Sequence, residues 1–316
     1  MGDPLTALLL SPQYRAYVWG GQRLRPGSER TAEAWMVHEN NLIASGPLAG
    51  RSLGEAAAQL GADLLGRRAL ARTGLRFPLL IKLLDCAAWL SLQVHPNNAQ
   101  AVRLEGAGNF GKTEAWHILE AEPGAELLGG LRPGTGRAEL EQAIRCGTLL
   151  EKMQRLAVQA GDSLLIPAGM IHALGPGLLV YEVQQVSDIT YRVFDWNRPA
   201  SEGRALHIEK SIAAADPAAV GAIVPRGALA DGERRQLVTC EFFTLDLLVG
   251  ASNALDLDTG GESFHALTVF EGQAMAEGDG WRQPLGRFET ALIPAACGAY
   301  RLHPLGAMKA LVASAA

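Results

Sequence analysis

The amino-acid sequence predicts a mainly β protein, composed of a jelly-roll β-sandwich with inserted helices and a second, smaller β-domain. From about residue 156 to the C-terminus, short strand-like segments follow one another with Gly and Pro between them. That spacing is typical of sandwiches and jelly rolls. In the first half, helix-like and strand-like segments alternate unevenly, which does not fit the regular alternation of a βαβ sheet.

The first elements are a strand and a helix. YRAYVWGGQRL (14–24) is strand-like and runs into a Gly-Gly turn. SLGEAAAQLGADLLG (52–66) is helix-like, with Ser52 in position to cap its N-terminus and Glu55 three residues later to complete a capping box. We therefore expect a helix over 52–66.

Three further segments complete the first half. Residues 76–96 are apolar and break near Asp85 into two strands. The next stretch, PNNAQAVRLE, predicts a short helix capped by an asparagine. Residues 136–156 predict a second helical region.

We place the domain boundary in an Ala-, Pro- and Gly-rich stretch that begins near residue 216 and has no clear strand or helix pattern. We expect residues 1–215 to form a metal-binding catalytic domain with helical insertions. Residues 216–234 form a linker, and residues 235–316 form a smaller β-domain without metal.

Composition excludes several classes of function. The net charge is −5 and no Lys/Arg-rich block is present, so the chain has no basic surface for nucleic acid. The longest early apolar run, ALLL, is too short for a membrane span or a signal segment. The four cysteines show no CxxC spacing, which argues against disulfides and cysteine zinc sites and fits a reducing cytoplasm. An anionic small substrate would need local cations inside a pocket.

The stretch LSLQVHPNN (90–98) alternates apolar and polar residues. Leu90, Leu92 and Val94 share one face, and Gln93 and His95 the other. On one interpretation the polar face meets water, as in an ordinary half-buried strand. On the other it points into a barrel, where Gln93 and His95 hold a metal. The stretch alone does not decide between them.

Glu114 raises a similar question in GKTEAWHILEAEPGAEL (111–127). It shares a strand face with Trp116 and Ile118, and a carboxylate on an apolar face is costly unless it is paired or binds a metal. A one-residue slip at the strand start would instead leave it at a solvated edge.

The segment GDSLLIPAGMIHALG (161–175) has the spacing G-x5-P-x-G-x2-H, ending at His172. A lone histidine between apolar neighbours is usually a core residue. The spacing, however, resembles the second motif of the cupin superfamily, whose jelly roll binds a metal through that histidine. The resemblance implies that QVH stands for the HxH of the first cupin motif, followed by Glu114. Gln93, His95, Glu114 and His172 would then form a mixed N/O set that suits zinc, with iron, manganese or cobalt as alternatives.

The block YEVQQVSDITYRVFDWNR (181–198) reads as two strands joined at Ser187-Asp188. By itself it permits a surface network of Tyr191, Arg192 and Asp195. Together with WGGQRL, LSLQVHPNN, GKTEAWHILEAEPGAEL and GDSLLIPAGMIHALG, in that order over residues 15–200, it resembles the type I mannose-6-phosphate isomerases (phosphomannose isomerases) of the short bacterial kind. Five ordered motifs are far more specific than one.

That resemblance implies an aldose–ketose isomerase that interconverts mannose 6-phosphate and fructose 6-phosphate through a cis-enediol. It implies one Zn²⁺ per chain on His95, Glu114, His172 and Gln93. Arg192 would be the active-site arginine, able to stabilise an enediolate. Lys112 would be a second catalytic cation, near the substrate phosphate or a ring oxygen. These two residues and Trp19 would contact the substrate, a small sugar phosphate.

Several alternatives stay open. The general base is a Glu, an Asp, a His or a metal-bound water, and the protein is a monomer or a homodimer with no nucleic-acid or membrane partner. A non-catalytic sugar-phosphate-binding cupin is the second hypothesis, because the segment AEAWMVHENNLIASGP is reduced relative to the family. A non-haem iron cupin oxygenase is the third, because two histidines and a carboxylate also bind iron.

Overall fold

A computed structural model describes residues 5–199 and 204–316. Antiparallel β-sheets dominate it, so the predicted mainly β class is confirmed. The contacts divide the chain into two compact units, which we call the central unit (residues 14–34 and 82–226) and the C-terminal unit (residues 5–13, 35–81 and 227–316).

The central unit is a sandwich of two sheets. The five-stranded sheet has the order β12-β5-β10-β7-β8, and the seven-stranded sheet the order β13-β9-β6-β11-β4-β3-β2. Along the chain, β2, β3 and β4 each pass from one unit into the other. The strands are β2 (Gln13–Arg15), β3 (Glu33–Val37), β4 (Leu79–Cys86), β5 (Leu92–Val94), β6 (Glu114–Ala121), β7 (Glu126–Leu131), β8 (Met153–Ala157), β9 (Ser163–Ile166), β10 (His172–Leu174), β11 (Leu178–Gln185), β12 (Tyr191–Phe194) and β13 (Ile223–Val224).

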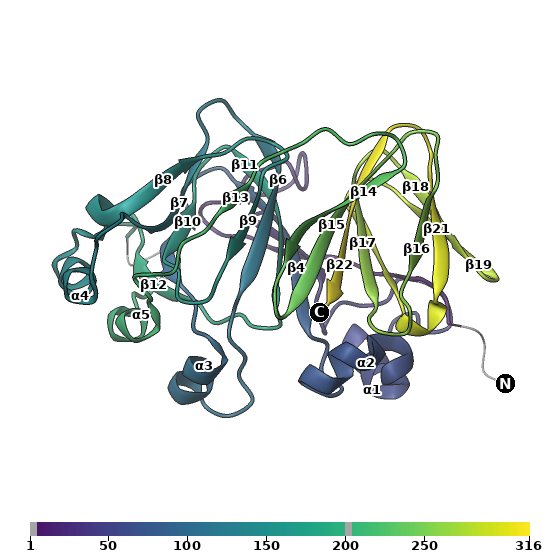
Figure 1. The fold of residues 1–316 in the computed structure, drawn as a ribbon, viewed down its shortest axis with the longest axis horizontal. Helices are drawn as coiled ribbons and strands as arrows, with labels where there is room; N and C mark the ends of the chain where they lie inside the picture. The colour runs from purple at the N-terminus through teal and green to yellow at the C-terminus, as the bar shows by residue number, and fades with distance from the viewer. Residues whose placement is uncertain (1–4, 200–203) are drawn as a thin grey trace. The chain divides into compact units, whose positions relative to one another are not determined.

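The core of the central unit lies between its two sheets. Trp116 and Ile118 on β6 pack there with Leu127 on β7 and Leu174 on β10. A second apolar cluster lies behind the five-stranded sheet, where α4 and α5 cover it (Figure 1). The helices of this unit are α3 (Asn98–Glu105), α4 (Arg137–Cys146), the 3₁₀ helix η1 (Leu149–Lys152) and α5 (Ile208–Ala214).

The C-terminal unit is a second sandwich. Its six-stranded sheet has the order β1-β20-β17-β22-β15-β14, its four-stranded sheet the order β16-β21-β18-β19, and an apolar core lies between them. The strands are β1 (Leu8–Leu9), β14 (Glu233–Thr239), β15 (Phe243–Gly250), β16 (Leu255–Asp258), β17 (His265–Glu271), β18 (Ala274–Gly278), β19 (Trp281–Leu285), β20 (Glu289–Ile293), β21 (Ala299–Pro304) and β22 (Met308–Ala315). Its helices are α1 (Leu53–Leu60), α2 (Ala62–Thr73) and the 3₁₀ helix η3 (Ala295–Cys297).

The units interleave along the chain, unlike the linear division expected from the sequence. Strand β1 pairs with β20 at the edge of the six-stranded sheet. The ring of Phe77 lies 4.6 Å from that of Phe264, and Gly66 packs directly on the backbone of Glu262. These long-range contacts make residues 5–13 and 35–81 part of the C-terminal unit.

Local signals predict the helix starts well. Ser52 and Glu55 form the expected capping box of α1, and Asn97 forms another with Gln100 at α3. The helix ends are predicted less well. The helix expected over 52–66 is two helices separated at Gly61.

The helical region expected over 136–156 is also too long. Helix α4 ends at Cys146, because Gly147 adopts a left-handed conformation (φ 73°, ψ 18°). Residues 153–157 then form strand β8, which pairs with β7.

Leu90 corrects the alternation expected for LSLQVHPNN. Leu92 and Val94 pack behind β5, as predicted. Leu90 instead joins the core between the sheets and lines a cavity. It precedes β5, so the two-residue alternation of a strand does not extend to it.

Within residues 5–199 and 204–316, no helix has the length and apolar composition that a membrane span requires.

Candidate metal centre and active site

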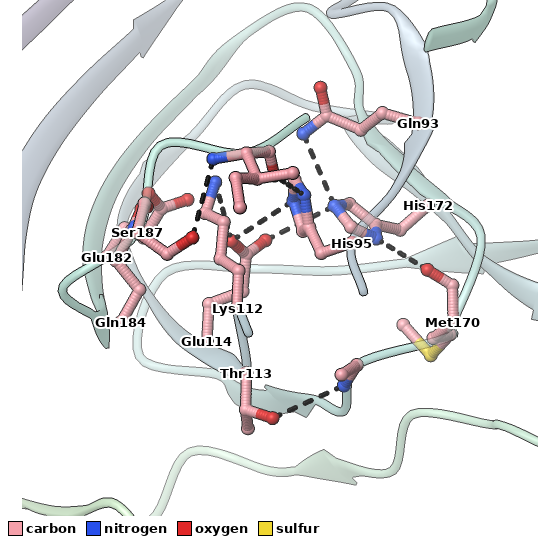
Figure 2. Close-up of polar contacts among 12 residues, drawn as sticks. Gln93, His95, Lys112, Thr113, Glu114, Met170, His172, Glu182, Gln184 and Ser187 are labelled. Carbon is pink, nitrogen blue, oxygen red and sulfur yellow. Dashed lines mark hydrogen bonds and ion pairs between the residues drawn. The ribbon is translucent and has the colours of Figure 1, made fainter. Parts of the chain in front are cut away.

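The candidate metal centre joins both sheets of the central unit. His95 follows β5, Glu114 begins β6 and His172 begins β10, and all three side chains are buried. The Nε2 atom of His95 lies 3.4 Å from Oε2 of Glu114, and Nε2 of His172 lies 3.2 Å from Oε1. One ligand atom of each residue lies within 4.8 Å of the others. Figure 2 shows the two imidazoles converging on the carboxylate.

Backbone contacts set the tautomer of both histidines. The Nδ1 atom of His95 contacts the carbonyl oxygen of Ile189 at 2.8 Å, and Nδ1 of His172 contacts that of Met170 at 2.9 Å. A carbonyl only accepts, so each Nδ1 carries the proton and each Nε2 presents a lone pair. Metal-binding histidines are commonly oriented in this way.

The environment keeps His95 and Glu114 in the protonation states that metal binding requires. Burial, and then Lys112, lowers the pKa of His95 well below its usual value, so the imidazole stays neutral. Burial acts to raise the pKa of Glu114, but Lys112 and the two histidines hold it well below its usual range. Both carboxylate oxygens of Glu114 and Nε2 of His95 are buried without a hydrogen-bond partner. These three acceptor atoms lie close together, and a bound cation would satisfy all of them.

Gln93 lies next to this centre. Its Nε2 is 3.3 Å from Nε2 of His172, and its Oε1 is 3.3 Å from the hydroxyl of Ser91. Rotating the terminal amide by half a turn exchanges these two atoms. The oxygen would then face the centre and the NH₂ group would face Ser91. The residues present therefore fit a four-ligand set of two imidazoles, a carboxylate and an amide.

Lys112 is held in place by the GKTE segment. Its backbone N–H donates to the carbonyl of Pro96 (2.9 Å), and that of Gly111 donates to Oδ1 of Asn98 (2.8 Å). The ammonium group is buried and lies 3.1 Å from Oε2 of Glu114 (Figure 2). Lys112 is therefore not a solvated residue at a turn tip.

A cavity of about 540 Å³ opens beside the centre, a size suited to a small metabolite. Four of the residues predicted from the sequence line it: Trp19, Gln93, Lys112 and Arg192. The structure therefore brings the predicted substrate-contacting residues to one cavity. Arg192 on β12 lies opposite Gln93 on β5 in register.

Sequence analysis missed a second group of charged residues in this cavity. Lys82 on β4 is buried, and its ammonium group lies 3.6 Å from Glu33 and 3.4 Å from Glu182. Burial acts to lower the pKa of Lys82, but the two carboxylates hold it above its usual value. Burial, and then the charge of Glu114, raises the pKa of Glu182. Part of the signal was present, since Lys82 interrupts the apolar run LLIKLL of β4.

Comparisons with known proteins show which chains this one is similar to. A family model described as the catalytic domain of type I phosphomannose isomerase matches residues 8–115. The mannose-6-phosphate isomerase of Streptococcus mutans is 40% identical over 224 residues, 67% of each chain. The mannose-6-phosphate isomerase ManA of Bacillus subtilis is 31% identical over 311 residues, 94% of this chain and 95% of its own.

The fold agrees as well. A crystal structure of a mannose 6-phosphate isomerase from Bacillus subtilis superposes with a TM-score of 0.85 at 29% identity, covering 98% of this chain and 99% of that one.

Proposed function

The chain belongs to the type I mannose-6-phosphate isomerase family, and we propose that it interconverts mannose 6-phosphate and fructose 6-phosphate with one Zn²⁺ per chain. The observation that carries this proposal is the convergence of His95, Glu114 and His172 beside a cavity lined by Lys112 and Arg192. A mixed set of imidazole, carboxylate and amide ligands suits zinc. The cavity cations suit an anionic sugar.

The reaction moves a proton between C1 and C2 of the open-chain sugar through a cis-enediol. Bound zinc would supply Lewis acidity toward the sugar oxygens. Arg192 stabilises negative charge on those oxygens with a guanidinium that stays protonated. Lys112 keeps Glu114 ionised and adds a second cation at the cavity wall.

We assign the proton transfer between carbons to Glu182. It lines the cavity, and its raised pKa brings it closer to the operating pH, as general acid–base catalysis requires. Glu182 takes the proton from C2 and returns it to C1, while a proton passes from O2 to O1. These two proton transfers together convert mannose 6-phosphate to fructose 6-phosphate, with no atom gained or lost.

Metal analysis and a coupled isomerase assay test the proposal on the purified protein. We expect about one zinc per wild-type chain and turnover of fructose 6-phosphate. His172→Ala loses zinc and at least 100-fold in turnover, because a ligand with no replacement is removed. His303→Ala, a half-exposed histidine of the C-terminal unit, is the matched control and keeps both.

The outcome also separates the alternatives. A zinc-loaded wild type that binds the sugar phosphate without turnover would contradict the isomerase and support the non-catalytic binding protein. Iron-dependent oxygen uptake would support the oxygenase.

We also propose that the protein works in a reducing cytoplasm. The thiols of all four cysteines are unpaired, which is compatible with that setting.

A further inference from the structure

His207 is bound twice to the backbone of Arg192. Its N–H donates to the carbonyl oxygen of Arg192 (2.8 Å), and the N–H of Arg192 donates to Nδ1 of the imidazole (3.2 Å). Because Nδ1 accepts this bond, the neutral ring carries its hydrogen on Nε2. Burial, and then the charges of Arg192 and Lys210, lower the pKa of His207, which favours the neutral form. The imidazole is therefore available as an acceptor for the Arg192 amide.

These two bonds satisfy the outer edge of a strand. Strand β12 stands at the end of the five-stranded sheet, next to β5. An edge strand leaves N–H and C=O groups unpaired on its outer side. The pairing with β5 is also irregular after Arg192, because the register shifts between Arg192 and Phe194. His207 thus takes the place of a neighbouring strand at the point where β12 is least regular.

Helix α5, which directly follows His207, packs beside β12 (Figure 1). Lys210 in its first turn pairs with Glu105 at the end of α3 (2.7 Å). The same carboxylate accepts from the hydroxyl of Tyr191 (2.8 Å), the residue before Arg192 in β12. The helix that carries His207 and the strand that carries Arg192 are therefore tied to one group.

The far end of α5 is fixed as well. Arg137 of α4 donates to the carbonyl oxygens of Ile212 (2.6 Å) and Ala215 (2.5 Å). Gln100 of α3 donates to the carbonyl oxygen of Ala213 (3.2 Å). The last carbonyls of a helix have no partner within it, and these side chains supply one. Helix α5 is thereby joined to α3 and α4 and forms a firm support beside the edge of β12.

The side chain of Arg192 depends on this support. It lines the cavity, and its Nε is buried without a hydrogen-bond partner. Within the described parts of the chain, Arg192 forms no ion pair. Its guanidinium is therefore placed by the backbone from which it extends. A cation stabilises developing negative charge best when it is held in place before the reaction.

We propose that His207 is a positioning residue, which anchors the backbone of Arg192 so that its guanidinium stays at the reacting oxygens of the substrate. The inference rests on the proposed function for the role of Arg192. It adds a residue outside the five motifs that carry the family resemblance.

His207→Ala and His207→Asn test this proposal together. Alanine removes the acceptor, so we expect kcat for fructose 6-phosphate to fall about 10- to 100-fold, with KM within about twofold of wild type, because Arg192 acts on charge that develops in the transition state. Asparagine offers an oxygen in place of Nδ1 and is favoured at a helix N-cap. His207→Asn should therefore keep kcat within about threefold of wild type.

Two controls separate positioning from a general loosening of the structure. Glu209→Gln removes the exposed ion pair between α5 and Arg145 of α4 (2.5 Å) and should change neither kcat nor KM. In an Arg192→Gln background the guanidinium is already gone, so adding His207→Ala should cost little further turnover. Zinc content should stay that of the wild type in His207→Ala, because the ring bonds to Arg192 and not to a proposed metal ligand.

Hydrogen exchange at the Arg192 amide gives a readout that does not require turnover. We expect this amide to be protected in the wild type and in His207→Asn, and to exchange much faster in His207→Ala. Protection that depends on His207 in a protein without turnover would contradict the isomerase and keep the anchoring role.

Several results would overturn the anchoring role. One is wild-type kcat, or wild-type protection of the Arg192 amide, in a folded His207→Ala. Another is a full further loss of turnover when His207→Ala is added to Arg192→Gln. A third is rescue by His207→Gln and not by His207→Asn, because the longer amide reaches the position of Nε2. If His207→Ala does not fold, His207→Asn decides, and loss of both turnover and amide protection in that variant overturns the proposal.

Discussion

At the scale of single residues, buried histidines differ in the group that their Nδ1 atom contacts. In His95 and His172, Nδ1 meets a backbone carbonyl and Nε2 faces Glu114. In His265 of the C-terminal unit, Nδ1 instead contacts the hydroxyl of Tyr300 at 2.9 Å. Among the described residues, only the first pair belongs to a cluster that could hold a metal. Burial alone does not identify a metal ligand.

His265 gives a pH prediction. Burial, and then Arg234, lowers its pKa from 6.5 to about 4. Between these values the unfolded chain binds more protons than the folded chain, so stability rises with pH and is lost as the pH falls. From pH 7 to pH 5, we expect the wild type to lose about 2 kcal/mol more of its free energy of unfolding than His265→Gln.

Urea titrations at both pH values measure this difference. His303→Gln is the control, because its ring is half-exposed, and it should follow the wild type. Equal losses in wild type and His265→Gln would contradict the depressed pKa.

Residue identity alone could not assign Lys82 or His207. Lys82 interrupts an apolar strand, which indicates a special role but names no partner. Its partners Glu33 and Glu182 are distant in sequence. His207 follows the most specific motif without belonging to it, and its bonds to Arg192 appear only in the folded chain.

At the scale of elements, the GKTE segment depends on a close approach of two backbones. A Cβ atom at Gly111 would lie 2.6 Å from backbone atoms of Asn97 and Asn98 and 2.8 Å from the carbonyl oxygen of Pro96. This contact holds the link between β5 and α3 against the segment that leads into β6. The same contact sets the positions of Lys112 and Glu114.

We therefore expect Gly111→Ala to separate the two segments. Backbone atoms cannot move aside as a flexible side chain can, so the overpacking should cost about 1–3 kcal/mol of unfolding free energy. Displacing Lys112 and Glu114 should also lower kcat for fructose 6-phosphate by at least 10-fold.

Thermal melts and the coupled assay measure both effects. Gly286→Ala is the matched control, since its Cβ would meet only the Glu289 side chain at 3.5 Å or more. A Gly111→Ala variant with the stability and turnover of this control would show that the close approach is dispensable.

At the scale of the whole molecule, the proposed metal would link the two sheets of the central unit. His172 begins β10 and His95 directly follows β5, both strands of the five-stranded sheet, and Glu114 begins β6 of the seven-stranded sheet. A metal that binds only the folded state stabilises it by mass action. The gain is about 4 kcal/mol when free metal exceeds its dissociation constant 1,000-fold.

Calorimetric melts with and without a chelator check this prediction. We expect removal of the metal to lower the melting temperature of the wild type by several degrees, and added zinc to restore it. His172→Ala should show neither change. A wild-type melting temperature unaffected by chelator and by zinc would contradict the site.

The sequence by itself determined the features that depend on neighbouring residues. Capping boxes at Ser52 and Asn97 and the break between β4 and β5 follow from short-range spacing. The ordered motifs were enough to indicate the fold class and the family. The four proposed metal ligands and three substrate-contacting residues were named from the same motifs, and their roles remain predictions for the assays above.

Tertiary structure decided what depends on distant segments. The motifs together favoured an inward polar face of LSLQVHPNN, but only the folded chain places His95 within reach of Glu114 and His172. The same is true of the interleaved units, the position of Leu90, the Lys82 ion pairs and the bonds between His207 and Arg192. Strands that pair in the fold can be separated by loops of any length, so no fixed spacing in the sequence indicates which strands pair. Helix caps and strand alternation, by contrast, occur at fixed spacings that can be read from the sequence.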